Sequence, residues 1–299
     1  MKQGKRDPQD KRRRIGFIGA GTVGTALAVR LSNKGYPVVA VYSRSKRSAQ
    51  RLAELVKGCS AYDEAQAVAN NAELVFITTP DGAIPQVVSE VQWRSGQGVI
   101  HCSGADSVVV LEPARQRGAF VGGFHPLQTF ANVQYAIENI PGSTFAIEAE
   151  EPLFSSLQDM AGALGGSWVR LSAGDKVLYH TAAVIACNYL VTLVKLSTDL
   201  WHSFSVDTTK ATQALLPLLR GTLNNIENVG IPNCLTGPIA RGDLGTIDKH
   251  INALKLAAPD ILPAYRELGL QTIPIALAKG KIDESRAKEL ETTLKEKMS

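Results

Sequence analysis

Residues 15–24 read IGFIGAGTVG, and this stretch decides the fold of the first half of the chain. The apolar run Ile15–Ile18 ends directly in glycines, as a buried parallel strand does. Thr22–Lys34 follows as a predicted helix, because its apolar residues recur at four-residue spacing on one side. Gly19–Gly24 therefore matches G-x-G-x-x-G between a strand and a helix, which is the context that gives the pattern a mechanism.

Each glycine of this pattern has a separate role in a dinucleotide site. Gly19 allows the tight turn, Gly21 leaves room for a pyrophosphate, and Gly24 lets the helix pack closely on the strand. The backbone N–H groups of Thr22 and Val23, at the start of the helix, would face the phosphates. We therefore expect a bound dinucleotide; the alternative is a glycine-rich turn in another doubly wound fold.

The residues after the second predicted strand distinguish between two cofactors. An NAD site usually carries Asp or Glu about 20 residues beyond the glycines, but this chain has Ser43, Arg44 and Ser45 there. Arg44 can hold a 2′-phosphate with two hydrogen bonds, and the serine hydroxyls can donate to the same group. This predicts NADP(H); a solvated basic turn that also accepts NAD is the alternative.

Apolar runs and amphipathic stretches alternate up to about residue 171, which predicts a doubly wound, mostly parallel sheet with helices on both faces. Thr79, Pro80, Ser103 and Gly104 follow two of the strands, where they would touch the cofactor or form plain loops. We expect strands at Ile15–Ile18, Val38–Tyr42, Leu74–Thr78, Gly98–His101, Phe120–Gly123, Thr144–Glu148 and Ser167–Leu171, and helices at Thr22–Lys34, Ser45–Val56, Ile84–Val91, Val108–Gln116 and Pro152–Leu164.

Strand patterns stop after Leu171, so an all-α domain should follow. Its first helix, Asp175–Phe204, is apolar nearly all round, which predicts burial inside that domain or against a partner subunit. Such a helix makes a homodimer the expected assembly. The chain then divides into a basic tail (1–14), a Rossmann-like domain (15–172, with its core at 15–130 and extra strands at 143–171) and a helical domain (173–299), whose later helices are expected at Thr208–Val229, Thr246–Ala257, Pro259–Leu268 and Glu284–Lys297.

Charge and composition exclude several classes of protein. The net charge is +4, but residues 1–14 alone carry +5, which leaves −1 for the rest and gives no support to nucleic-acid binding. The tail lacks the apolar residues needed for order or for a secretory signal. It also contains acidic residues and is not amphipathic, unlike a transit peptide. The four cysteines are scattered, as in a reduced cytoplasmic protein without a zinc site. The apolar run Thr181–Val194 is shorter than the ~20 residues of a membrane span.

Five segments resemble a known set of proteins. They are GAGTVG (19–24), HCSGA (101–105), HPLQTF (125–130), HTAAVIACNYLVTL (180–193) and LTGPIARGD (235–243), with His250 after them. The first domain is similar to those of pyrroline-5-carboxylate reductase, prephenate dehydrogenase, 6-phosphogluconate dehydrogenase and the deazaflavin-linked NADP oxidoreductases. The whole set is typical of Rossmann-like proteins with the domain of unknown function 2520. This resemblance implies an oxidoreductase whose helical domain is similar to the C-terminal domain of 6-phosphogluconate dehydrogenase, forms dimers and builds the substrate pocket.

Two details limit what this resemblance implies about chemistry. The hydroxyacid dehydrogenases of the superfamily carry a catalytic lysine four residues before an asparagine on the long helix. If Asn188 matches that asparagine, the lysine position is Val184, so lysine chemistry does not carry over. The turn at Thr236–Pro238 instead resembles the substrate loop of pyrroline-5-carboxylate reductase, without that family's Gly-Thr-Thr ending.

A small set of polar residues remains for catalysis and substrate binding. His125, His180 and Asn188 are the catalytic candidates, with structural roles as the alternative. Thr236, Gly237, Arg241, Asp243 and His250 are the substrate-binding candidates; Arg241 can bind a carboxylate, whereas Asp243 can equally cap a helix. His101 and His202 are read as structural, and no spacing of the histidines suggests a metal.

Two functions fit these residues. The first is an NADP(H)-dependent oxidoreductase that acts on a small carboxylate-bearing imine, ketone or alcohol. The second is a non-catalytic NADP(H)-binding sensor or partner module, which the lysine missing at residue 184 favours. The retained polar set, above all His125, His180 and Asn188, favours the enzyme.

Overall fold

The computed structural model describes residues 12–295, which form two compact units that divide between Cys187 and Asn188. The division lies inside the long helical stretch, whereas the sequence placed it near residue 172. The first turns of that stretch contact the sheet domain directly, because Tyr179 bonds to His125 and Lys176 to the backbone of Ser103. These contacts assign the start of the helix to the first unit.

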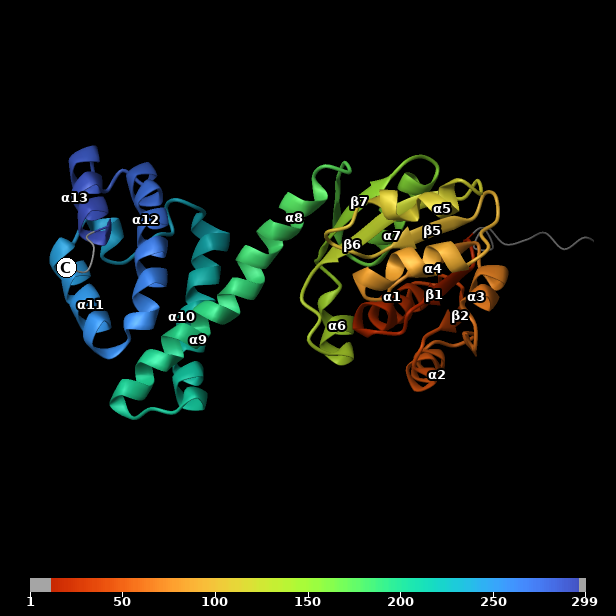
Figure 1. Cartoon of the computed structure of the whole chain (residues 1–299), viewed down its shortest axis with the longest axis horizontal. Coiled ribbons are helices and arrows are strands. Elements are labelled where there is room, and N and C mark those ends of the chain that lie inside the picture. Colours follow the sequence, from red (N-terminus) through yellow and green to blue (C-terminus); the bar gives the residue numbers. More distant parts are fainter. Residues whose placement is uncertain (1–11, 296–299) are drawn as a thin grey trace, which may run out of the picture. The chain divides into compact units, whose positions relative to one another are not determined.

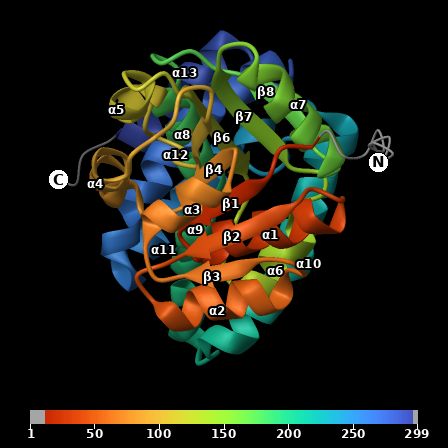
Figure 2. The same cartoon turned by 90° about the vertical axis from the view of Figure 1, so that its right-hand side faces the viewer.

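The first unit contains a single eight-stranded sheet, which confirms the predicted α/β fold class. Its strand order is β3-β2-β1-β4-β5-β6-β7-β8, the doubly wound order extended by two strands (Figure 2). Only β6 and β7 pair antiparallel. The strands are β1 (Ile15–Ile18), β2 (Val38–Tyr42), β3 (Ser60–Tyr62), β4 (Leu74–Ile77), β5 (Gly98–His101), β6 (Phe120–Leu127), β7 (Thr144–Ala149) and β8 (Ser167–Arg170).

Helices cover both faces of this sheet and bury it completely at its centre, where β1 and β4 have no exposed residue. The short elements β3, α3 and α6 were not expected from the sequence, because none has enough apolar residues to show a period. On one face lie α1 (Thr22–Asn33), α2 (Lys46–Leu55), α6 (Val133–Asn139) and α7 (Leu153–Ala163); on the other lie α3 (Ala65–Asn71), η2 (Asp81–Ala83), α4 (Ile84–Glu90), η3 (Val108–Leu111) and α5 (Glu112–Arg115).

Strand β6 is longer than expected, and this changes the place of His125. The sequence predicted that the strand ends at Gly123 and that His125 follows it. The strand instead continues to Leu127, because antiparallel β7 pairs along it and sets His125 opposite Ala146. His125 is therefore held inside the sheet and not on a loop.

Part of the basic tail is ordered. We expected residues 1–14 to be disordered, but the Arg12 guanidinium lies 4.3 Å from the centre of the Tyr36 ring and bonds to the carbonyl of Lys34. The backbone N–H of Arg14 donates to the Glu73 carboxylate at 3.0 Å. The expectation is thus wrong for residues 12–14, while residues 1–11 lie outside the described part of the chain.

The long helical stretch is continuous but not a single α-helix (Figure 1). It consists of α8 (Lys176–Ala183), the π-helical turn η4 (Val184–Asn188), α9 (Tyr189–Trp201) and η5 (His202–Phe204). The π turn breaks the 3.6-residue repeat, so the eight-residue spacing of His180 and Asn188 does not place the two residues on one α-helical face. Such turns occur often at functional sites.

The second unit is all-helical, as predicted. Its core comes from three helices that bury Ile247, Leu254, Ile273 and Leu290 among others. Helix α12 begins at Leu262 and continues to Ala278, beyond the expected end at Leu268, although Pro274 lies inside it. After α9, the elements are α10 (Thr208–Val229), η6 (Ile239–Arg241), α11 (Leu244–Ala257), η7 (Pro259–Ile261), α12 (Leu262–Ala278) and α13 (Glu284–Lys295).

The apolar helices α9 and α10 are largely exposed, contrary to the burial expected inside the helical domain. Only Thr198 of α9 and Ala211 of α10 are buried, whereas Val191 and Leu218 are 69% and 66% exposed. By length and composition alone, Lys176–Phe204 could also cross a membrane, with a mean hydropathy of 1.7 in its most apolar window. One such helix is weak support for a membrane protein.

Candidate functional site

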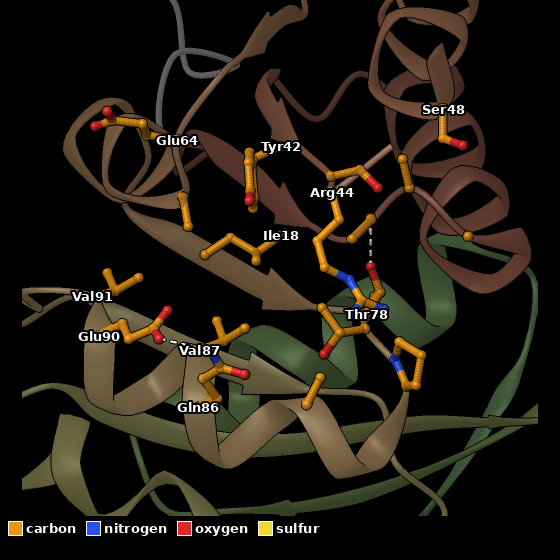
Figure 3. A pocket seen from close by; sticks show the side chains of 18 of the residues that line it. Ile18, Tyr42, Arg44, Ser48, Glu64, Thr78, Gln86, Val87, Glu90 and Val91 are labelled. Carbon is orange, nitrogen blue, oxygen red and sulfur yellow. Dashed lines mark hydrogen bonds between the residues drawn. The ribbon is translucent and has the colours of Figure 1, made fainter. Parts of the chain in front are cut away.

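A cavity of about 490 Å³ lies at the carboxyl ends of β1, β2 and β4. Figure 3 shows Arg44 reaching across it toward Thr78, with Gln86, Val87 and Glu90 of α4 on the far wall. The predicted cofactor residues Gly19, Gly21, Ser43, Arg44, Thr79 and Pro80 line this cavity. Its volume suits part of a dinucleotide.

The three glycines of the first turn have the geometry that the pattern requires. Gly19 has a φ of +113°, and a Cβ there would lie 2.6–2.8 Å from the backbone of Thr78 and Thr79. A Cβ on Gly24 would collide with the Thr78 hydroxyl, which itself donates to the Gly19 carbonyl at 2.8 Å. A Cβ on Gly21 would meet nothing within 4 Å, so it would project into the open cavity where a phosphate group needs the space.

Arg44 is the cation of this cavity. Its guanidinium makes no ion pair within residues 12–295, whereas nearby Lys46 pairs with Asp63 at 2.6 Å. The Ser45 hydroxyl is used locally, since it caps α2 by accepting from the backbone N–H of Ser48. Thr22 and Val23 begin α1 but do not line the cavity with their side chains. Arg44 and Ser43 are thus the groups free to bind an anion here.

A second group of polar side chains lies within the first unit, and we call it the histidine cluster: His101, His125, Tyr179, His180 and Lys176. They come from β5, β6 and α8. The Tyr179 hydroxyl lies 2.8 Å from Nδ1 of His125, with the two rings edge to face. The rings of His125 and His180 have centroids 6.1 Å apart.

Gly104 is the point on which two of these histidines converge. A Cβ there would lie 2.6 Å from Nδ1 of His180 and 2.9 Å from Nε2 of His125. Nδ1 of His180 is buried and has no hydrogen-bond partner in the described residues. Both nitrogens therefore face a position that only glycine leaves open. The described part of the chain contains no group of three His, Cys, Asp or Glu side chains placed to hold a metal ion.

Burial keeps His101, His125 and Tyr179 of this cluster uncharged at neutral pH. It lowers the pKa of His101 and of His125 to about 3, with the positive charge of Lys176 as the second cause for both. Burial also raises the pKa of Tyr179 to about 12. These two imidazoles and the phenol can therefore take part in proton transfer in the protonation state that they already have at neutral pH.

The loop after β5 connects this cluster to the neighbouring strand end. The Ser103 hydroxyl donates to Asp81 at 2.8 Å and accepts from the backbone N–H of Asp106 at 2.9 Å. Neither Ser103 nor Gly104 lines the cavity at Arg44. Their predicted contact with the cofactor thus stays a prediction, and the structure shows that Ser103 already shapes its own loop.

Sequence reasoning missed Tyr179 and Lys176 and read His101 as structural. Lys176 is 1% exposed and begins α8, one turn before His180. The superfamily resemblance points to Val184, four residues before Asn188, and not to Lys176. The sequence pattern that could have identified Lys176 is a lysine four residues before a histidine at the start of the apolar helix.

The predicted substrate residues lie in the second unit and do not all gather in one place. Thr236, Gly237 and Arg241 line a cavity of about 430 Å³ together with Lys279 and Lys281. Asp243 caps α11 by accepting from the backbone N–H of Thr246 at 3.0 Å, the alternative given by the sequence.

The remaining candidates have other surroundings. His250 does not line that cavity, and its Nδ1 lies 3.0 Å from the Tyr265 hydroxyl. His202 lies 3.0 Å from the Thr208 hydroxyl, in keeping with a structural role. Asn188 is exposed at the end of the π turn, and its catalytic role stays a prediction.

Comparison with known proteins supports the fold seen here. The chain is 25% identical to BF3122 from Bacteroides fragilis, a candidate NADP oxidoreductase, with a TM-score of 0.72 over 88% of this chain and 98% of that one. A reductive aminase from Aspergillus terreus, solved with NADPH and ethyl-5-oxohexanoate, has a TM-score of 0.65 at 18% identity, covering 93% and 99%. At that identity the likeness concerns the fold alone.

A curated relative matches a smaller part of the chain. The 2-(hydroxymethyl)glutarate dehydrogenase of Eubacterium barkeri is 22% identical over 191 residues, which is 60% of this chain, and the match spans 61% of that enzyme's length. Two family models cover most of the chain. Residues 1–126 match the Rossmann-like domain, and residues 143–272 match a domain of unknown function, DUF2520. The chain is therefore a Rossmann-like protein that carries DUF2520.

Proposed function

We propose that this protein is an NADP(H)-dependent oxidoreductase that acts on a small carboxylate-bearing imine, ketone or alcohol. The main support for the proposal is that one domain contains both the cavity beside Gly19 and Gly21 and the buried histidine cluster, which can act in acid–base chemistry. The names of the similar proteins support it, since they include a candidate NADP oxidoreductase, an NADPH-bound reductive aminase and a dehydrogenase.

The residues present fit NADP(H). Gly21 leaves open the space that a pyrophosphate would take, and the strained φ of Gly19 forms the turn beneath it. Arg44 would hold the 2′-phosphate, with the Ser43 hydroxyl beside it. No carboxylate follows β2 at residues 43–48 to repel that phosphate. When bound, the nicotinamide supplies or accepts the hydride.

The histidine cluster supplies the proton that hydride transfer requires. Tyr179 is the proposed proton donor, because this half-buried residue places its hydroxyl beside the neutral ring of His125. To give its proton to a substrate nitrogen or oxygen, Tyr179 must accept a hydrogen bond from Nδ1–H of His125. Nε2 of His125 is then an acceptor that faces Gly104. His180, beside it, completes the polar wall.

The proposal is tested first by fluorescence titration with NADPH and NADH. We expect NADPH to bind at least tenfold more tightly, and Arg44→Ala to weaken NADPH binding by about 10- to 100-fold while leaving NADH unchanged, since a charged hydrogen bond contributes about 1.5–3 kcal/mol. Arg51→Ala is the matched control, because Arg51 is exposed on α2 and does not line the cavity. Equal affinities for the two cofactors would refute the role of Arg44.

A turnover screen separates the two functions that the sequence left open. NADPH consumption is measured with cyclic imines, with keto acids, and with ketones in the presence of amines; NADP⁺ reduction is measured with hydroxy acids. Turnover of any member supports the enzyme. Tight NADPH binding without turnover across all four classes would instead favour a non-catalytic NADP(H)-binding module.

A homodimer explains the exposed apolar helices of the second unit. Tyr189 and Val191 of α9 and Leu218 and Leu223 of α10 are all more than half exposed. A patch of this kind on a monomer usually marks an interface. We place the protein in the cytoplasm, in keeping with cysteines that form no disulfide within residues 12–295.

Light scattering after gel filtration tests this assembly. We expect a mass of about twice the 32.0 kDa of the chain, and the double substitution Val191→Asp with Leu223→Asp should give monomers. Leu256→Asp is the control, since Leu256 is 89% exposed on α11, away from these two helices in sequence. A monomer, or a protein that partitions into lipid vesicles, would contradict the dimer.

A further inference from the structure

Lys176 is a buried charge that the proposed chemistry does not use. Among residues 12–295 it is the one lysine with almost no exposed surface, at 1%. Its Nζ donates to the carbonyl oxygen of Ser103 at 2.7 Å. It forms no ion pair with any described residue. Burying an ammonium group with one neutral acceptor is costly, so packing alone does not account for it.

One residue, Ser103, connects Lys176 to the rest of the cluster. Its carbonyl accepts from Lys176, its backbone N–H donates to Nδ1 of His101 at 3.2 Å, and its hydroxyl donates to Asp81. The bond from Ser103 fixes neutral His101 with its hydrogen on Nε2. A displacement of Lys176 would therefore move the loop that holds His101 and carries Gly104.

Lys176 also acts on the histidines by its charge. Its positive charge lowers the pKa of both His101 and His125, after the larger effect of burial. The pKa of Lys176 is itself lowered by burial, and nearby carboxylates oppose that shift, Glu148 most. Glu148 stays in place because it accepts from the Ser107 hydroxyl and from the backbone N–H of Val108. The titratable groups around Lys176 are Asp81, Cys102, Asp106, Glu148, His101 and His125.

We infer that Lys176 is a positioning residue, which holds the Ser103 loop in place and keeps His101 and His125 uncharged so that His125 can orient the Tyr179 hydroxyl. The inference rests on the proposed function, because orienting the Tyr179 hydroxyl matters only in an enzyme. The effect of Lys176 on the Ser103 loop and on the two histidines can be measured without turnover. A neutral side chain at residue 176 removes a repulsive charge, and it also leaves the negative charge of Glu148 less balanced. Both changes raise the pKa of the neighbouring histidines.

The test is an NMR titration of the ring nitrogens of the five histidines. His202→Gln and His250→Gln assign the two exposed rings, and single substitutions assign the others. In Lys176→Met, which keeps length and removes charge, the pKa of His125 should rise by about one unit or more. Lys176→Arg should keep it low, and Lys57→Met, at an exposed site, is the matched control. A folded Lys176→Met protein with unchanged histidine titrations would overturn the inference.

The wild-type chain supplies an independent measurement if Lys176→Met fails to fold. His101 and His125 should both stay neutral down to about pH 4, and His101 should show the hydrogen on Nε2. A titration of either ring above about pH 6 refutes the inference. None of these readouts uses NADPH or a substrate. Failure of the cofactor titration with normal histidine shifts would therefore reject the proposed enzyme and leave the role of Lys176 standing.

Discussion

The chain contains two histidine–tyrosine pairs with nearly the same local geometry. Nδ1 of His125 lies 2.8 Å from the Tyr179 hydroxyl, with ring centroids 5.6 Å apart and planes at 89°. Nδ1 of His250 lies 3.0 Å from the Tyr265 hydroxyl, with centroids 5.9 Å apart and planes at 82°. The first pair joins β6 to α8, and the second joins α11 to α12.

Their surroundings differ, and this is what separates a candidate acid–base site from an ordinary surface contact. His125 of the first pair is buried beside a second histidine and a buried lysine. Burial first, and then the positive charge of Lys176, lower the pKa of His125 to about 3. His250 is exposed, and no second histidine ring packs on it in the described chain. Pairing alone therefore indicates little; burial and the neighbouring charges decide what the pair can do.

The largest effect expected from this comparison concerns the two tyrosine hydroxyls. Tyr179→Phe removes the proposed proton donor and should lower kcat about 100-fold or more, with the NADPH dissociation constant unchanged. Tyr265→Phe removes the same group from the matched pair and should leave kcat within twofold of the wild type. Steady-state kinetics on the best substrate of the screen measures both. Equal effects of the two variants would remove Tyr179 from the proposed chemistry.

A smaller effect is expected from filling the space between the histidines. Gly104→Ala would place a Cβ 2.6 Å from Nδ1 of His180 and 2.9 Å from Nε2 of His125, so the rings must move. We expect turnover to fall about tenfold and stability by about 1–3 kcal/mol. Gly174→Ala is the control, because a Cβ there meets nothing within 4 Å. Unchanged turnover in Gly104→Ala would show that the ring positions do not matter.

The glycine cavity was predictable from the sequence because its residues are contiguous. Gly19, Gly21 and Gly24 lie in one turn and match a known spacing, even though Thr78 and Thr79, which restrict Gly19 and Gly24, lie far away in the chain. Arg44 was predictable as well, because it follows the end of β2, the strand adjacent to β1. Fixed spacing after a strand is therefore enough to locate such residues.

The histidine cluster was only half predictable, because tertiary contacts assemble it. His125 and His180 were recognised as polar residues at suggestive places, but their partner Tyr179 is one position from His180 and carries no pattern of its own. Lys176 resembled a solvated lysine at a helix start, and only the approach of Ser103, 73 residues away in the chain, buries it. The exposure of α9 and α10 was not predictable either. An apolar helix pattern indicates that a face is buried, but not whether the same chain or a partner subunit buries it.

The smallest effect expected is on stability against acid, and it again distinguishes the two pairs. Above about pH 6.5 His101 and His125 are neutral in both the folded and the unfolded state. Below it the unfolded chain binds protons that the folded chain refuses, because the folded pKa of each is about 3. The free energy of unfolding should thus fall with pH by roughly 1 kcal/mol per pH unit for each histidine. Urea unfolding between about pH 8 and pH 4.5 measures the slope. His125→Gln should reduce it and His250→Gln should not, so equal slopes in the two variants would mean that His125 is not held neutral by the fold.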